Sequence, residues 1–262
     1  MPLWTVEEVA KPVLKRPVLI EGLPGIGNVG KVAVDFMIEN TKAVKLASFF
    51  SHTLPHSAFV NEDNLLELPT IEAFYKKSKN GKDVIFLIGD VQPSDEVSCY
   101  EFCETILSFA KKWDCSEIVT LGGIGLQSPP KNPKVYITGT NKKAIAQYTS
   151  PTIEKNIYGV VGPVIGVSGV LAGLAERKNI PAVTLLAETF GHPLYLGVKG
   201  ARALVLALEK KLKLGLSVKN LDKEIKELED ETMKKSRDLT QAQEQSKMLR
   251  MGSGNKEVNY IG

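Results

Sequence analysis

The sequence predicts an α/β domain in which helices cover both sides of a largely parallel sheet. Short apolar runs alternate with amphipathic stretches along most of the 262 residues, a pattern typical of alternating strands and helices. The predicted strands are continuously apolar, as expected for strands buried on both faces. The composition, with 43% hydrophobic and 24% charged residues, excludes disordered, collagen-like and disulfide-rich classes.

Each element is predicted from its own local pattern. The continuous, β-branched run at 83–88 is the strongest strand signal, whereas Pro69 weakens the signal around it. A helix follows Ser94 or Asp95, since either side chain can cap its first amides. Pro193 suits the first turn of a long helix. In chain order we expect a strand at 17–21, a helix at 27–40, strands at 43–50, 65–75 and 83–88, a helix at 95–113, strands at 117–121 and 135–138, a glycine-rich helix within 158–175, a strand at 182–187 and a helix at 194–214.

The composition changes after residue 215. Leu221, Ile225, Leu228 and Thr232 keep one apolar stripe at helical spacing, while most other positions nearby are Lys, Glu or Asp. Such a narrow stripe suits packing on a partner or on the body of the domain. A solvated helix held by ion pairs four residues apart is equally compatible.

These changes divide the chain into three parts. We expect an α/β core domain at 1–215, a C-terminal helical extension at 216–250 and a flexible tail at 251–262. The tail has the make-up of a linker, yet it ends in the bulky pair Tyr260-Ile261 before Gly262.

Charge and hydropathy narrow the function. The 33 basic and 30 acidic side chains give a formal charge of +3 that is not gathered into one block, so we expect no nucleic-acid partner. The N-terminus lacks the charged and apolar regions of a signal peptide. No stretch reaches the roughly 18 uninterrupted apolar residues of a membrane helix. We therefore expect a cytoplasmic protein without a membrane partner.

The cysteines and histidines predict no metal site. A zinc site could be assembled on paper from Cys99, Cys103, His52 and His56, but their spacing matches no metal-binding motif. Together with Cys115 the cysteines are odd in number and too few for a disulfide framework. We expect buried, reduced cysteines and no cofactor.

Two glycine motifs have structural explanations. Gly25-Ile-Gly-Asn-Val-Gly30 follows a strand and opens a helix, as in dinucleotide-binding units, but the next predicted strand ends without an acidic residue for a ribose. Positive φ angles and close helix–strand approach explain its glycines. Ser168 lies in a partial nucleophile-elbow motif within a series of small residues, for which we expect a helix packed closely on another backbone.

Three carboxylates could form an acid–base site. Glu21, Asp90 and Glu188 each fall at the C-terminal end of a predicted strand, the edge where ligands collect in open α/β sheets. Convergence of the three would raise one pKa toward a general-acid role. Each also has a simpler role in satisfying loop amides or capping helices.

Five motifs occur in order between residues 18 and 213: IEGLPGIGNVG at 20–30, GDVQP at 89–93, LGGIG at 121–125, GPVIGVSGVLA at 162–172 and IPAVTLLAET at 180–189. Together they resemble the archaeal homologues of the eukaryotic proteasome assembly chaperones. The resemblance implies a fold similar to that of nucleoside phosphorylases, an α/β sandwich around a mixed, partly barrel-like sheet, without their catalysis. It also implies homo-oligomers that associate with the α-ring of the core proteasome.

The resemblance further implies docking through the C-terminus. Family members end in a hydrophobic residue, a tyrosine and any residue, and this end inserts between adjacent α-subunits. Here Tyr260 is instead third from the end. Either the pocket tolerates a shifted register, or the tail serves another partner. The candidate partner-binding residues are Val258, Asn259, Tyr260, Ile261 and Gly262.

We therefore expect a non-enzymatic, homo-oligomeric protein that binds proteasome α-subunits, as an assembly chaperone or an ATP-independent activator. The extension at 216–250 is expected to pack between or above subunits. One alternative is a nucleoside-phosphorylase-like enzyme that uses Glu21, Asp90 or Glu188 as acid–base groups. Another is a scaffold that captures small proteins through its helical segment.

Overall fold

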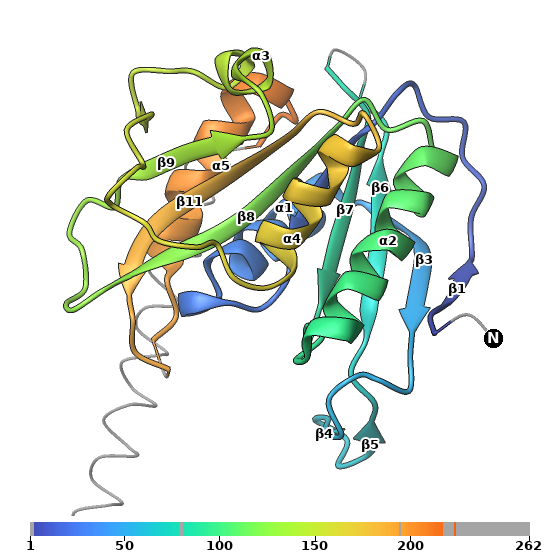
Figure 1. Cartoon of the computed structure of the whole chain (residues 1–262). Helices are drawn as coiled ribbons and strands as arrows, with labels where there is room; N and C mark the ends of the chain where they lie inside the picture. The colour runs from blue at the N-terminus through green and yellow to red at the C-terminus, as the bar shows by residue number, and fades with distance from the viewer. Residues whose placement is uncertain (1–2, 79–80, 194, 217–222, 224–262) are drawn as a thin grey trace, which may run out of the picture.

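The computed structural model describes residues 3–78, 81–193, 195–216 and 223 (Figure 1). The strands are β1 (Thr5–Glu8), β2 (Val18–Gly22), β3 (Val44–Phe50), β4 (Phe59–Val60), β5 (Leu66–Glu67), β6 (Ile71–Lys76), β7 (Val84–Gly89), β8 (Glu117–Leu126), β9 (Val135–Gly139), β10 (Ile153–Glu154) and β11 (Ala182–Phe190). The helices are η1 (Ile26–Asn28), α1 (Val29–Thr41), α2 (Glu96–Lys112), α3 (Lys142–Gln147), α4 (Val167–Arg177) and α5 (Val198–Leu212).

A nine-stranded mixed sheet forms the centre, in the order β1-β3-β6-β7-β2-β8-β11-β9-β10. Its four middle strands, β7, β2, β8 and β11, run parallel. Antiparallel pairing begins at β6 on one side and at β9 on the other. The predicted α/β class with a mixed, largely parallel sheet is therefore confirmed, and β2 and β7 are buried along their whole length, as their apolar runs indicate.

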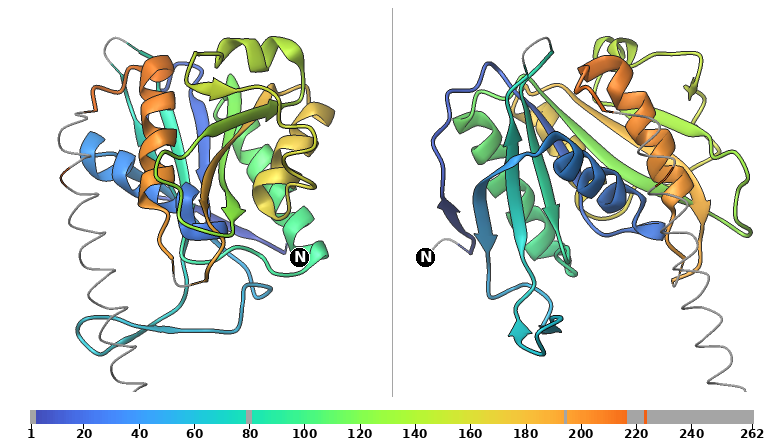
Figure 2. Two further views of the ribbon diagram at one scale, coloured as in Figure 1. Left: turned by 90° about the vertical axis from the view of Figure 1, so that its left-hand side faces the viewer. Right: turned by 180° about the vertical axis from the view of Figure 1, so that it is seen from behind.

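Helices cover both faces of the sheet. Helices α1 and α5 pack together on one face, and α2 and α4 on the other (Figures 1 and 2). The α1/α5 side holds one apolar cluster, which includes Phe86 and Leu204, and the α2/α4 side holds the other, which includes Phe102 and Leu171. Among the described residues, none of the helices is both long and apolar enough to cross a membrane.

Several predicted elements differ in extent. The stretch 65–75 is divided at Pro69, because β5 pairs with β4 in a separate hairpin while β6 joins the main sheet. Strand β8 continues past Leu121 through Gly122, Gly123 and Gly125 to Leu126. Helix α2 begins as expected, with Asp95 accepting the amide of Ser98 at 2.9 Å. Elements β1, β4, α3 and β10 were not predicted.

The glycine-rich helix within 158–175 begins only at Val167, and the expected close packing of its small residues is wrong. A Cβ at Gly162 or Gly173 would meet nothing within 4 Å. At Gly169 it would lie 2.0 Å from the carbonyl oxygen of Val164, in the loop that precedes the helix. At Gly166, which has φ +83°, a Cβ would lie 2.7 Å from Oε1 of the Gln92 side chain. Gly166 and Gly169 thus serve the start of the helix, and the four glycines form no continuous stripe against another backbone.

Candidate functional site

A crevice of about 510 Å³ lies at the carboxyl edge of the sheet. The loop after β2, the end of β8 and the loop before α4 form its walls. These walls carry three of the five sequence motifs, and Gln92 and Leu186 add one residue each from the other two. The lining residues are Leu23, Pro24, Gly25, Ile26, Val29, Gly30, Gln92, Leu121, Gly122, Gly123, Ile124, Gly125, Val160, Val161, Gly162, Pro163, Val164, Ile165, Gly166, Ser168 and Leu186.

Backbone geometry explains the glycines of the first wall. Gly27 has φ +61°, and a Cβ there would lie 2.5 Å from Oγ1 of Thr189. A Cβ at Gly30 would lie 2.5 Å from the carbonyl oxygen of Leu121. Glycine is thus needed to bring α1 against β8, in agreement with the structural explanation of the motif. The amide nitrogen of Gln92 donates to Pro24 O at 2.7 Å, and its oxygen accepts from Val167 N, which ties the loop after β2 to the start of α4.

A buried carboxyl–hydroxyl pair lies beside the crevice. Ser168 Oγ donates to Glu21 Oε2 at 2.9 Å, and Leu23 N donates to Glu21 Oε1 at 2.9 Å. Glu21 is fully buried, on the side of β2 that faces α4. Burial raises the pKa of Glu21 from its ordinary 4.5 to about 7, although both hydrogen bonds oppose this rise by favouring the ionised form.

The pKa of Glu21 predicts a pH-dependent stability. In the unfolded chain this carboxyl loses its proton near pH 4.5, whereas in the folded chain it keeps the proton to about pH 7. Between these values the folded state binds more protons, so stability falls as the pH rises through this window. Relative to the natural chain, Glu21→Gln should therefore gain about 3 kcal/mol in free energy of unfolding between pH 4.5 and pH 8.

Urea unfolding at a series of pH values measures this difference. Ser168→Ala supplies an informative comparison, because it removes a hydrogen bond that favours the ionised form of Glu21. The pKa of Glu21 in the folded chain should then rise further, so stability should go on falling to a higher pH than in the natural chain. Parallel pH profiles for the natural chain and Glu21→Gln would contradict the assignment.

The three strand-edge carboxylates do not converge. Asp90 Oδ2 accepts from the amide and hydroxyl of Thr70, on the α1 side of the sheet, where it lines a depression with Lys31. Glu188 accepts from Lys134 N at 3.0 Å and from the hydroxyl of Tyr136 at 3.3 Å. Each carboxylate thus satisfies local donors, as in the simpler of the two explanations.

The geometry of Ser168 does not indicate an activated nucleophile. Its hydroxyl donates to Glu21 and also approaches Leu121 O at 3.3 Å. The ring of His192 stacks on Phe190 at 5.5 Å, and His52 contacts Phe50 edge-on, so both imidazoles contact other aromatic rings. The hydrogen bond between Ser168 and Glu21 joins residues 147 positions apart. Its only sequence signal was Glu21 itself, a glutamate inside an otherwise apolar strand.

The four residues considered for a zinc site do not come together. Cys99 and Cys103 lie on the buried face of α2, while His52 and His56 are exposed in the loop after β3. All three cysteines are buried and free, as expected. Within the described ranges, no group of three or more His, Cys, Asp or Glu side chains is placed to hold a metal ion.

Exposed apolar side chains border the crevice. Ile26, Tyr158, Val160 and Ile165, which we call the apolar rim, are each more than half exposed. Three of them also line the crevice. The β4–β5 hairpin adds a second exposed set, which projects from the body at the same end in Figure 1: Phe59, Val60, Leu65, Leu66 and Leu68. Exposed apolar groups of this kind mark interaction surfaces; neither set was predicted from the sequence.

The predicted docking residues Val258, Asn259, Tyr260, Ile261 and Gly262 lie outside the described residues, as does almost all of the extension at 216–250.

Comparison with known proteins gives consistent matches. The sequence profile of the PAC2 family matches residues 19–235. An uncharacterized protein of Methanocaldococcus jannaschii is 30% identical over 230 residues, which are 85% of this chain and 87% of that protein.

Comparison with solved structures finds proteins of the same fold. PbaB of Pyrococcus furiosus, described as an archaeal proteasome activator, is 29% identical, with a TM-score of 0.80 over 90% of this chain and 100% of that one. PbaA of the same organism, described as an archaeal homolog of proteasome-assembly chaperone, shares the fold, with 24% identity and a TM-score of 0.71 over 94% and 98% of the two chains.

Proposed function

This chain belongs to the PAC2 family, and from that we propose that it is a non-enzymatic proteasome-binding protein, either an assembly chaperone or an ATP-independent activator. It acts in the cytoplasm as a homo-oligomer and binds α-subunits of the core proteasome. The observation that carries the proposal is the match to PbaB, an archaeal proteasome activator, at 29% identity over 90% of this chain. The local satisfaction of Glu21, Asp90 and Glu188 supports a role without catalysis.

A binding assay with purified α-rings tests whether the core proteasome is the partner. The immobilised full chain should retain purified α-rings of an archaeal core proteasome, whereas an unrelated protein of similar charge should not. Failure to retain them would remove the proteasome as the partner.

We assign self-association to the apolar rim. Ile165 is 85% exposed and Tyr158 is fully exposed, and burying such side chains in an interface contributes about 1.5–3 kcal/mol each. Ile165→Asp should therefore weaken the oligomer by roughly tenfold or more. Val13→Asp is the matched control, because Val13 is 81% exposed but lies outside the rim. Light scattering after size-exclusion chromatography, over a range of concentrations, measures the effect. Equal dissociation of both variants would remove the rim from the interface.

The crevice with Glu21 beside it supports a second candidate, a nucleoside-phosphorylase-like enzyme. A thermal-shift screen with nucleosides and phosphate tests it. A true substrate at 100 times its Kd stabilises the folded protein by about 2.7 kcal/mol. We expect no such stabilisation from any nucleoside.

A further inference from the structure

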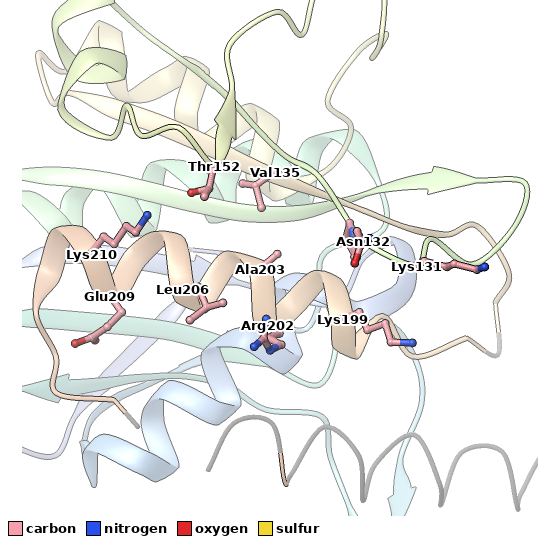
Figure 3. Close-up of a pocket in the computed structure, with 11 residues that line it drawn as sticks. Lys131, Asn132, Val135, Thr152, Lys199, Arg202, Ala203, Leu206, Glu209 and Lys210 are labelled. Carbon is pink, nitrogen blue, oxygen red and sulfur yellow. The ribbon is translucent and has the colours of Figure 1, made fainter. Parts of the chain in front are cut away.

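A groove of about 770 Å³ follows the outer face of α5 (Figure 3). One side is α5 itself; the other is the chain before and into β9, with Thr152. In Figure 3, Lys131 and Asn132 lie toward the Lys199 end of the helix, and Thr152 and Val135 lie above its middle. The lining residues are Lys131, Asn132, Pro133, Val135, Thr152, Lys199, Arg202, Ala203, Leu206, Glu209 and Lys210.

The groove combines an apolar floor with a cationic border. Pro133, Val135, Ala203 and Leu206 form the apolar part. The charged lining residues are Lys131, Lys199, Arg202, Lys210 and a single carboxylate, Glu209. A complementary occupant is a helix with a narrow apolar stripe and acidic flanks.

Glu209 is used by the turn that follows α5. Its two oxygens accept from Leu214 N and Gly215 N, each at 3.0 Å. Lys213 and Gly215 both have left-handed backbone angles, with φ +53° and +78°, and Leu214 and Leu216 pack back onto the α1/α5 cluster. The chain therefore turns sharply at the Lys210 end of the groove. Short connections of this kind join antiparallel helices.

The sequence directly after this turn has the complementary pattern. Leu221, Ile225 and Leu228 form its apolar stripe. The twelve residues 221–232 also contain six acidic side chains and two lysines. The stretch of α5 from Lys199 to Lys210 has the same length, so a returning helix would cover it, about 18 Å on each side. An antiparallel return brings the acidic 227–231 end opposite Lys199 and Arg202.

We propose that residues 221–232 form a helix that docks antiparallel in the α5 groove of the same chain. The apolar stripe packs on Ala203 and Leu206, and the acidic flanks face the cationic border. This selects packing on the body of the domain over packing on a partner, and it holds whether or not the chain binds a proteasome.

A cysteine pair in the full chain tests this docking. Ala203→Cys with Leu228→Cys, which lie level in this antiparallel register, should form an intramolecular disulfide under mild oxidation, read by non-reducing electrophoresis and intact mass. The matched control is Ala203→Cys with Asp230→Cys, because position 230 lies near the same level but opposite the stripe on a helix; its yield should be roughly tenfold lower. The natural cysteines are buried on the other side of the sheet.

Charge exchange provides a second test in the same background. Arg202→Glu should lower the yield of the 203–228 disulfide roughly twofold to threefold, and Glu227→Arg in the same chain should restore it. Disulfide-linked dimers as the main product would assign the groove to a second copy. Equal yields from the test and control pairs would remove the segment from the groove. Either result overturns the proposal.

Discussion

Deletion of residues 258–262 is expected to abolish retention of α-rings by this chain. The deletion removes the aromatic ring of Tyr260 and the apolar side chain of Ile261. Burial of an aromatic ring and capture of a terminal carboxylate are established modes of recognition. Loss of the ring alone costs about 1.5–3 kcal/mol per site, or roughly 10- to 100-fold in affinity. Because an oligomer presents several tails, the loss multiplies through effective concentration.

Three variants sharpen this experiment, which biolayer interferometry on immobilised α-rings can measure. Tyr260→Ala should reproduce most of the loss, whereas Ser253→Ala, in the same tail, should bind like the full chain. Deletion of Gly262 alone places Tyr260 next to last, as in the tails implied by the family resemblance, and should bind at least as tightly. Equal binding by the full chain and by the chain lacking 258–262 would remove the tail from the mechanism.

Gly30→Ala is expected to lower the free energy of unfolding by about 2–3 kcal/mol. A Cβ at this position would lie 2.5 Å from the carbonyl oxygen of Leu121, and the obstructing atom is backbone that cannot rotate away. Overpacking of a close contact typically costs about 1–3 kcal/mol. Urea unfolding followed by tryptophan fluorescence measures the change, since Trp4 and Trp113 are both in or against the α2-side core.

Gly25→Ala is the matched control within the same motif. A Cβ there meets nothing within 4 Å, and the φ of −160° is open to any residue. Its effect should stay within about 0.5 kcal/mol. This pair separates packing from ligand binding, because a phosphate cradle would need both glycines for the approach of its ligand. Equal destabilisation by the two substitutions would contradict the packing explanation.

The centre of the fold could be predicted because its signals are local and long. β2 and β7 are continuous apolar runs, and Asp95 caps α2 as its side-chain type indicates. The sheet edges could not be predicted in the same way. The edge strands β1 and β10 have only four and two residues, which is too short for a period-2 pattern to be recognised. Their pairing depends on tertiary contacts that no local pattern encodes.

The candidate site was predictable only in its parts. The motifs around Gly25, Leu121 and Gly162 were each visible, but their meeting in one crevice depends on strand order, since β2 and β8 are neighbours although about 95 residues apart. The partner of Glu21 was missed for the same reason. Three residues of the apolar rim, Tyr158, Val160 and Ile165, lay within a glycine-rich run that suggested a helix, and their exposure follows from the late start of α4 at Val167.

Native mass spectrometry of the full chain mixed with α-rings of an archaeal core proteasome tests the central claim most directly. The claim predicts a species with the combined mass of one homo-oligomer of this chain and one α-ring, formed without ATP. Free rings beside uncomplexed chain at micromolar concentrations of both would contradict it.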